Sequence, residues 1–553
     1  MDSTVTYQVE ILNEPFEFET RKCDKTVLIK ILVQNQLISK KRFGLVAKEL
    51  VYQQLKENQE INLSRCYVKD FSITEYKKSI GFETSKHIDL NYFKAENAFF
   101  DCDLRTDFSF ISFNKGVNFE NTIFSHGNVS FFQCYFKSGV TNFKDAHFGN
   151  GEISFQYADF GDENVLFNSA VFEGGVVSFV NANFHVGQVD FKSANFNNSK
   201  VKFHYAKFDK GDISFQKAKF GNQTFDCRRV EFGSGKVDFR RAVFGDGFIT
   251  FDESEFIDGK INFRFVRFGN NDISFRKVDF GKGVVLFEDV NFGKGHVTFA
   301  RSKSKYLSFK GSHLDVYLDL KVAECDTIDL SDTVLRDIID LKPVTHPVKI
   351  NTIYLNGMRN LGKIVINWNE NRVEHLIKNQ RKTNYQQKAE EFNILKESFR
   401  NNGQYECEDK AYIQFKRFEQ KADMRRAIKK GGLSLIRLPY YVFRWLVFDK
   451  MGLYATNPLR VLFSMILIYI GFSFSFFFLH YLSLGDIINS VGAVDQLHYL
   501  QISFYHSAIT FLTIGYGDYY PTGFSRTISI VEGWTGLFLM SYFTVAFVRK
   551  ILR

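Results

Sequence analysis

The chain has 553 residues, which is more than one ordinary domain of roughly 100–200 residues. Its 71 Lys and Arg outnumber its 62 Asp and Glu, but much of the basic excess lies in residues 424–460, beside an apolar segment. This position favours membrane lipid over nucleic acid as the partner of these cations, so we expect no nucleic-acid ligand. The seven cysteines form no CxxC pair and no local cluster with histidine, which indicates unpaired thiols in a reducing compartment.

Residues 1–60 form an N-terminal region to which the sequence assigns no role. The opening residues MDSTVTYQVEILNEP lack a basic stretch followed by an apolar run. We therefore expect no cleavable signal peptide and a cytosolic N-terminal part. A helix is predicted within residues 40–58, KKRFGLVAKELVYQQLKEN.

Residues 119–299 repeat with a strict step of twelve. Phenylalanine recurs from Phe119 to Phe299 at this step, with Cys227 in the one missing place, and a second series runs five residues later from Phe124 to Phe292. Neither a helix of period 3.6 nor a long alternating strand has this spacing. A solenoid does, because every coil presents the same apolar residue to one shared axis.

The same spacing predicts the shape of one coil. Small or β-branched residues stand two positions before many of these Phe, as Ala182 and Val177 do, and two residues apart on an extended segment means the same face. Two faces cannot enclose a core, so we expect four faces and twenty-four residues per coil, with a Phe ladder on each face. At about 4.8 Å per coil, this section would make about eight coils and a rod of about 38 Å.

The repeat, for example VSFVNANFHVGQVDFKSANF, resembles the Phe-rich variant of the pentapeptide-repeat family. The resemblance implies a right-handed quadrilateral β-helix, which we assign to residues 61–370. Members of the family that mimic duplex DNA to bind a topoisomerase need a strongly acidic surface, whereas Lys and Arg interleave with Asp and Glu here. We interpret the rod as a scaffolding or regulatory element whose partner, if any, is an unidentified cytosolic protein.

Residues 371–432 change to a helical pattern. Apolar residues at helical spacing predict two amphipathic helices, broken by Asn401, Asn402 and Gly403. The pair forms a connector between rod and membrane, or couples a signal to the membrane part, and the sequence favours neither role. Residues 433–457 mix aromatic residues such as Trp445 with basic ones, which is typical of a lipid headgroup region.

Two apolar segments, residues 461–482 and 527–548, are long enough to cross a bilayer. The basic residues Arg460, Arg549, Lys550 and Arg553 flank them on one side, whereas the intervening loop carries Asp486 and Asp495. This asymmetry predicts a multi-pass protein of the cell membrane, inner or plasma, with both termini in the cytosol.

Between the two spans lies the stretch LTIGYGD, Leu512–Asp518. The apolar helical segment before it is too short to cross a bilayer, so we expect it to be re-entrant. Non-helical backbone at membrane depth is tolerated only where it lines an aqueous path or is buried in protein. Two closely spaced glycines make a helix improbable, so the sequence predicts a site rather than an ordinary loop.

Span, short helix, TIGYGD, proline and second span together resemble the pore domain of two-transmembrane potassium channels, which we assign to residues 458–553. The resemblance implies a selectivity filter and a homotetramer, because one chain supplies a quarter of the oxygen cage. Filter residues are Thr513, Ile514, Gly515, Tyr516 and Gly517. The first four would bind potassium through their carbonyls, and Thr513 also through its hydroxyl.

The resemblance also assigns supporting roles. Asp518 and Pro521 match the outer mouth, and Asp518 is expected to hydrogen-bond behind the filter. Gly536 lies near the family's bending position, where it serves either as a gating hinge or for close helix packing. Leu512 and Ile514 depart from the commonest residues of the family, but neither departure removes a predicted ion site.

The sequence therefore predicts a potassium channel with a cytosolic repeat rod and no cofactor apart from the permeant potassium ions. The alternative is a membrane-anchored scaffold whose pore is vestigial. An enzyme is not expected, because no phosphate loop, metal-ligand spacing or nucleophile motif stands out. No segment carries arginines at every third position, so a voltage sensor is not expected either.

Overall fold

The computed structural model describes residues 5–19, 21–431, 438–490 and 497–552. The chain divides into two compact units, Met1–Arg381 and Lys382–Arg553, which are described separately. Of the charged residues predicted around the two spans, Asp495 and Arg553 lie outside the described residues.

The first unit begins with a small antiparallel sheet. Strand β4 (Thr26–Val33) lies between β1 (Val5–Leu12) and β5 (Gln36–Val46), and a short hairpin of β2 (Phe16–Phe18) and β3 (Arg21–Cys23) adjoins it. This sheet was not predicted from the sequence.

The helix expected within residues 40–58 is shorter than predicted. Helix α1 spans Lys48–Lys56, because the preceding residues extend β5 along β4 and bury Phe43. Pairing and burial of this strand outweigh the local helical pattern. Strand β5 also pairs in parallel with β7 (Cys66–Lys69), which joins the sheet to the first coil. The short helix α2 (Ile73–Ser79) follows β7.

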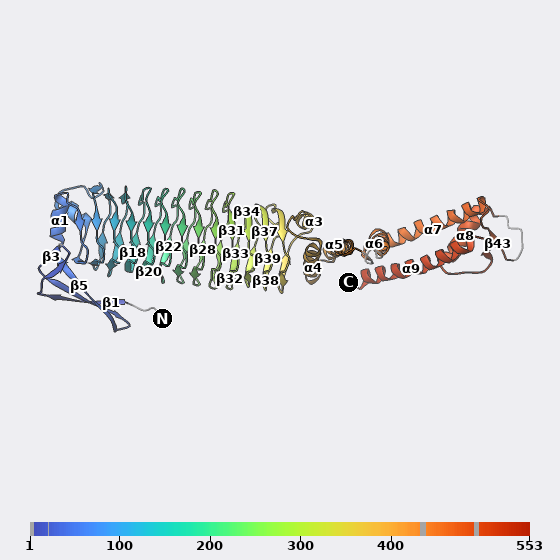
Figure 1. Ribbon diagram of the computed structural model, residues 1–553, viewed down its shortest axis with the longest axis horizontal. Helices are drawn as coiled ribbons and strands as arrows, with labels where there is room; N and C mark the ends of the chain where they lie inside the picture. The colour runs from blue at the N-terminus through green and yellow to red at the C-terminus, as the bar shows by residue number, and fades with distance from the viewer. Residues whose placement is uncertain (1–4, 20, 432–437, 491–496, 553) are drawn as a thin grey trace. The chain divides into compact units, whose positions relative to one another are not determined.

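The rest of the first unit is a β-solenoid (Figure 1). One of its sheets has 13 parallel strands over the described residues 61–354. These strands are β6 (Ile61–Asn62), β9 (Phe93–Lys94), β13 (Val117–Asn118), β17 (Thr141–Asn142), β19 (Val165–Leu166), β21 (Val189–Asp190), β23 (Ile213–Ser214), β26 (Val237–Asp238), β29 (Ile261–Asn262), β31 (Val284–Leu286), β34 (Lys303–Ser308), β37 (Glu324–Asp329) and β40 (Lys349–Tyr354). Val165 pairs with Val189, and Val189 with Ile213, so each regular coil has the predicted 24 residues.

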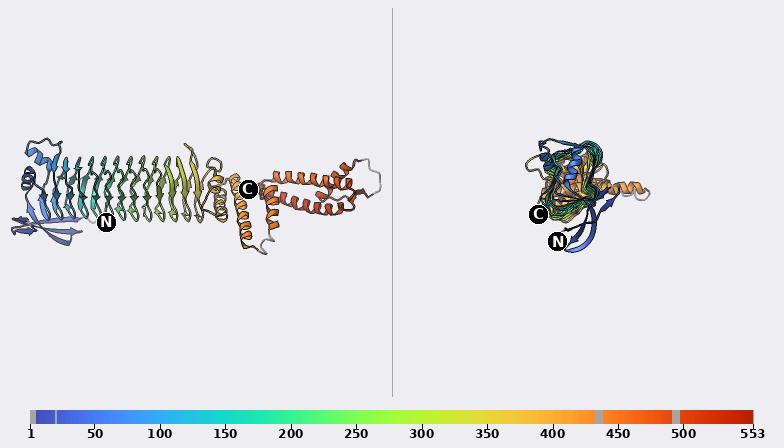
Figure 2. Two further views of the ribbon diagram at one scale, coloured as in Figure 1. Left: turned by 45° about the horizontal axis from the view of Figure 1, so that its top comes forward. Right: turned by 90° about the vertical axis from the view of Figure 1, so that its left-hand side faces the viewer.

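The second large sheet of the solenoid reaches β42 (Lys363–Val365), and the short helix α3 (Val373–Lys378) covers the last coil with buried Val373 and Ile377. In Figure 2, the view at right looks along the solenoid and shows its coils superimposed. The stacking gives every interior strand a partner on both sides, which leaves unpaired strand edges only at the ends of the solenoid.

Four ladders of stacked Phe rings fill the core, as the double step of twelve predicts. Ring centroids 24 residues apart lie 4.9 Å from each other in the pairs Phe131–Phe155, Phe143–Phe167 and Phe148–Phe172, and the rings are within 3° of parallel. Phe136 stacks on Phe160 at 5.0 Å in the fourth ladder. Neighbouring ladders meet edge to face, for example Phe143 and Phe155 at 81°, and both geometries are favourable for aromatic pairs.

The missing Phe at Cys227 is compensated two residues earlier. Phe225 occupies a place that Val201 and Ile249 hold in the adjacent coils. Its ring lies 6.2 Å from that of Phe203 and 5.9 Å from that of Phe251. The larger residue at 225 therefore fills the volume that a Phe at 227 would have taken.

Glycines recur where corners of successive coils approach. A Cβ on Gly211 would overlap the main-chain carbonyl of Gly187, and Gly235 meets Gly211 in the same way. This corner has no room for a side chain, which explains why glycine recurs there every 24 residues.

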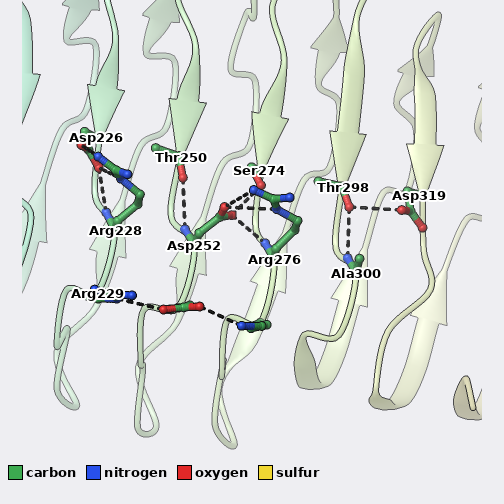
Figure 3. Close-up of polar contacts among 12 residues, drawn as sticks. Asp226, Arg228, Arg229, Thr250, Asp252, Ser274, Arg276, Thr298, Ala300 and Asp319 are labelled. Atoms are coloured by element: carbon green, nitrogen blue, oxygen red, sulfur yellow. Dashed lines mark hydrogen bonds and ion pairs between the residues drawn. The ribbon is translucent and has the colours of Figure 1, made fainter. Parts of the chain in front are cut away.

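Charged side chains on one face of the solenoid are paired within and between coils (Figure 3). Arg228 binds Asp226 at 2.7 Å in its own coil, and Arg276 binds Asp252 of the preceding coil at 3.0 Å. Glu253 accepts hydrogen bonds from Arg229 and from Lys277, which lie one coil to either side. Such exposed pairs are individually weak, but their alternation leaves this face without a continuous acidic surface.

The second unit is helical. Its first two helices, α4 (Tyr385–Asn401) and α5 (Tyr405–Lys430), form the predicted hairpin, and the break falls at residues 402–404. Phe392 and Phe418 stack between them at 5.6 Å. Helix α6 (Leu438–Phe443) and the π-helical segment η2 (Arg444–Met451) follow, within the interval predicted to lie at the membrane surface.

Two helices of this unit are long and apolar enough to cross a membrane. Helix α7 (Pro458–Tyr481) has 24 residues and contains an 18-residue window with a mean hydropathy of 2.2, and α9 (Ser525–Ile551) has 27 residues and contains a window with 1.3. At 1.5 Å per residue, they are about 36 and 40 Å long. Between them lie β43 (Ile487–Asn489), α8 (Tyr499–Phe511) and β44 (Tyr519–Pro521).

Candidate functional site

Helix α8 packs against both long helices through polar contacts. The Tyr469 hydroxyl on α7 donates to the carbonyl of Phe504 at 3.3 Å, and the Ser507 hydroxyl on α8 donates to the carbonyl of Tyr469 at 3.3 Å. On the other side, Ser507 also donates to the buried Glu532 of α9, and His506 contacts Ser529 at 3.0 Å. Glu532 is therefore a hydrogen-bonding partner that faces protein.

The predicted filter residues follow directly after α8. The backbone turns through positive φ at alternate residues, 56° at Thr513, 59° at Gly515 and 79° at Gly517. Glycine adopts this region readily, while Thr513 adopts it at a cost in steric energy. The helix thus ends in a segment with alternating backbone handedness.

The predicted filter side chains are exposed in the single chain. Ile514 is 48% exposed and Tyr516 71%, and the neighbouring Leu512 is 45% exposed. Apart from the glycine and its two chain neighbours, no heavy atom of the described residues lies within 4 Å of a Cβ placed on Gly515 or Gly517. Three exposed apolar side chains in one short segment form an apolar patch on the single chain. The Thr513 hydroxyl donates to the carbonyl of Leu512 at 2.7 Å.

The far end of this segment is tied to α8 and to a small ribbon. Asp518 accepts a hydrogen bond from the Tyr505 hydroxyl at 2.7 Å, and its main-chain carbonyl accepts one from the amide of Ser490 at 2.8 Å. Pro521 lies in β44, which pairs antiparallel with β43 through the register Ile487–Pro521. This ribbon was not predicted from the sequence, in which the consecutive residues Ile487 and Ile488 are the only local signal for it.

Gly536 lies where the backbone of α9 comes close to the end of α8. It is buried, and a Cβ there would overlap the main-chain carbonyl oxygen of Phe511. Of the two roles left open for this glycine, close packing accounts for it in this structure. The hinge role stays a prediction.

The connector helix α5 contacts the end of α9 and the segment η2. Asp409 accepts a hydrogen bond from Arg549 at 3.1 Å, and Lys550 lies 3.8 Å from the same carboxylate. The Arg417 guanidinium binds Asp449 of η2 through two nitrogens at 2.8 and 3.0 Å. These contacts join residues far apart in the chain, so no local sequence pattern could have predicted them.

Two tyrosines complete this junction. Tyr542 of α9 accepts a hydrogen bond from the amide of Ala455 at 2.9 Å, and Gln420 of α5 donates to the carbonyl of Tyr441 at 2.6 Å. Tyr454 donates to the side-chain oxygen of Gln420 at 3.1 Å. The end of α9, the start of α7 and the connector are thereby held by one polar network.

The comparisons with known proteins bear on the second unit. A family model described as an ion channel matches residues 464–553. The matched range contains most of α7, all of α8, the TIGYGD segment and α9. No curated protein and no solved structure matches the chain.

Proposed function

Residues 464–553 are an ion-channel domain in a chain that also carries a Phe-rich β-solenoid, and from this premise we propose that the protein is a potassium-selective channel. It would let potassium pass down its electrochemical gradient across the cell membrane. The observation that carries the proposal is the TIGYGD segment between α8 and α9, with positive φ at residues 513, 515 and 517.

Selectivity would come from oxygen atoms that replace the water around the ion. The carbonyls of Thr513, Ile514, Gly515 and Tyr516, with the Thr513 hydroxyl, form the proposed ligand set, and rings of backbone carbonyls are the known means of selecting potassium. Gly517 supplies a further positive φ at the end of the set. Asp518 would hold the segment against α8 through Tyr505.

The pore would be completed by four copies of the chain. One segment of four carbonyls offers only one side of an ion cage, and the side chains of Ile514 and Tyr516 are exposed in the single chain. A homotetramer around the TIGYGD segment would complete the cage and bury these side chains. In this arrangement Arg460, Arg549 and Lys550 lie on the cytosolic side, which places both termini there.

The connector would carry force between the cytosolic part and the pore. Helix α5 binds α9 through Asp409 and η2 through Arg417, so a displacement of α5 pulls on both. The alternative, a scaffold with a vestigial pore, leaves these contacts with a purely structural role. We assign the rod a regulatory or scaffolding role upstream of this connector.

Ion flux into liposomes that contain the purified chain tests the proposal. Gly515→Asp should abolish potassium flux, because a side chain at positive φ and a carboxylate both disrupt the carbonyl set. Gly403→Asp is the matched control, since it also has positive φ and open space but lies in the connector turn. Potassium flux at the wild-type level in both variants would show that the segment does not conduct.

A further inference from the structure

Two cysteine thiols meet at the junction between the N-terminal sheet and the first coil. Cys23 in β3 and Cys66 in β7 both lie against Gly44 of β5, and their thiols interact with each other. Gly44 of β5 pairs with Cys66, and a Cβ placed on Gly44 would lie 2.5 Å from Cys23 Sγ and 3.0 Å from Cys23 Cβ. The absence of a side chain at residue 44 therefore makes room for the Cys23 thiol beside Cys66.

A cation lies against this pair. The Arg21 guanidinium donates a hydrogen bond to Cys66 Sγ at 3.1 Å and another to the carbonyl of Asn62. The hydrogen bond with Cys66 lowers the pKa of Cys23 to about 7, and the Arg21 charge acts in the same direction. The bond with Cys23 and burial raise the pKa of Cys66. Cys23 is thus the nucleophile of the pair near neutral pH, since the thiolate is the reactive form.

The pair adjoins a cavity of about 510 Å³. Cys23 lines it, together with the cations Arg21, Lys22 and Lys25 and the polar Gln53 on α1. The lining also contains the carboxylates of Asp24 and Glu57, so the cations exceed the carboxylates by one, and this positive balance favours an anionic molecule with carboxylates. The cavity gives such a molecule access to a thiol that is otherwise 8% exposed.

The other cysteines lack this combination. Cys134 and Cys325 are buried, which raises the pKa of each to about 12, and burial also raises the pKa of Cys227 and Cys102. Cys407 is half-buried on α5. Among the cysteines of the described residues, only Cys23 and Cys66 have a second thiol as neighbour, and Cys66 also accepts a hydrogen bond from a guanidinium.

We propose that Cys23 and Cys66 form a redox-active dithiol site, which a low-molecular-weight disulfide bearing carboxylates oxidises to an intramolecular disulfide from the adjoining cavity. The Cys23 thiolate attacks one sulfur of the small disulfide, whose S–S bond breaks and releases one thiolate. Cys66 then gives its proton to that thiolate and attacks the Cys23 sulfur, which releases the second small thiol after protonation. The protein loses two electrons and two hydrogens, and one small disulfide becomes two thiols.

The product would join β3 to β7 covalently. Before oxidation, the β2–β3 hairpin contacts the first coil through side chains such as Arg21. After oxidation, residues 23–66 form a closed loop that holds the hairpin and the sheet on the end of the solenoid. The N-terminal region, to which the sequence assigned no role, would thereby respond to oxidation.

Glutathione disulfide is the probe for this proposal. The full-length protein in detergent is incubated with it at pH 7.5, free thiols are alkylated, and peptides are identified by mass spectrometry. We expect a Cys23–Cys66 cross-link in the wild type. Cys66→Ser should instead retain a glutathionyl group on Cys23, and Cys23→Ser should leave Cys66 unmodified. Cys134→Ser, the matched control, should form the cross-link at the wild-type rate.

Charge and pH provide a second readout that does not depend on cross-linking. Lys25→Glu should slow oxidation by glutathione disulfide but not by the neutral hydroxyethyl disulfide. The alkylation rate of Cys23 should reach half its maximum near pH 7. A wild-type protein without the cross-link, a glutathionyl group on Cys66 in Cys23→Ser, or slower alkylation of Cys23 than of Cys407 would each overturn the proposal.

Discussion

Asp409 on the connector helix α5 binds Arg549 near the end of α9, with 3.1 Å between carboxylate and guanidinium, although the two residues are 140 positions apart in the chain. Their side chains are only 11% and 23% exposed, so solvent screens the pair weakly. Of the proposed pore helices, α9 is the one that follows the filter. The Asp409–Arg549 ion pair at the end of α9 is therefore positioned to hold this helix in place or to release it.

Asp409→Asn tests this tie. A hydrogen bond to a charged group contributes about 1.5–3 kcal/mol, so its loss should change the ratio of open to closed channels about tenfold or more. Single-channel recording measures this ratio. The control is Glu397→Gln, which removes a carboxylate exposed on α4. Unchanged gating in Asp409→Asn, or no recovery in the charge swap of Asp409→Arg with Arg549→Asp, would assign the contact a purely structural role.

Gly536 should tolerate no larger residue. Gly536→Ala forces a methyl group against the carbonyl of Phe511, and overpacking of this kind costs about 1–3 kcal/mol. We expect a less heat-stable tetramer and reduced potassium flux. Gly533→Ala, three residues earlier on the same helix, has open space and should behave as the wild type. A normally stable tetramer with altered gating in Gly536→Ala would favour the hinge role instead.

Tyr505→Phe should weaken the support of the proposed filter. The change removes the 2.7 Å hydrogen bond to Asp518 and leaves the ring in place. A bond to a carboxylate is worth about 1.5–3 kcal/mol, so the conducting arrangement should be populated less and current should decline faster after opening. Tyr520→Phe is the control, because Tyr520 is exposed on β44. Identical currents in the two variants would contradict the supporting role of Asp518.

The solenoid core offers a test of compensation between two positions. Cys227→Phe restores the repeat but should lower the stability of the solenoid by about 1–3 kcal/mol, because Phe225 already fills the space. Adding Phe225→Val should recover most of the loss. Thermal unfolding monitored by circular dichroism of the β signal checks both. Greater thermal stability of Cys227→Phe than of the wild type would mean that Phe225 does not fill the space at residue 227.

The regular parts of the structure could be predicted from the sequence because each is governed by a local rule repeated many times. The step of twelve implied a 24-residue coil with four Phe ladders, and the pairs Val165–Val189 and Phe143–Phe167 have that register. Length and apolar composition likewise located α7 and α9 to within a few residues.

What could not be predicted depends on long-range pairing. Strand β5 looked helical at its C-terminal end, and only its pairing with β4 and β7 makes it extended. The contacts of Asp409 with Arg549 and of Cys23 with Cys66 join distant residues, and nothing in the local sequence distinguishes these side chains from others of their type. The order of carbonyls in the proposed filter was clear, but the Tyr505 hydroxyl that holds Asp518 was not.

The most direct test of the central claim is the ratio of potassium to sodium flux through the purified full-length chain in liposomes. Four rings of backbone carbonyls from residues 513–516 should favour potassium strongly, so we expect potassium uptake under a gradient and almost no sodium uptake under the same gradient. Comparable uptake of the two ions would contradict the assignment of TIGYGD as a potassium filter, whatever else the channel domain conducts.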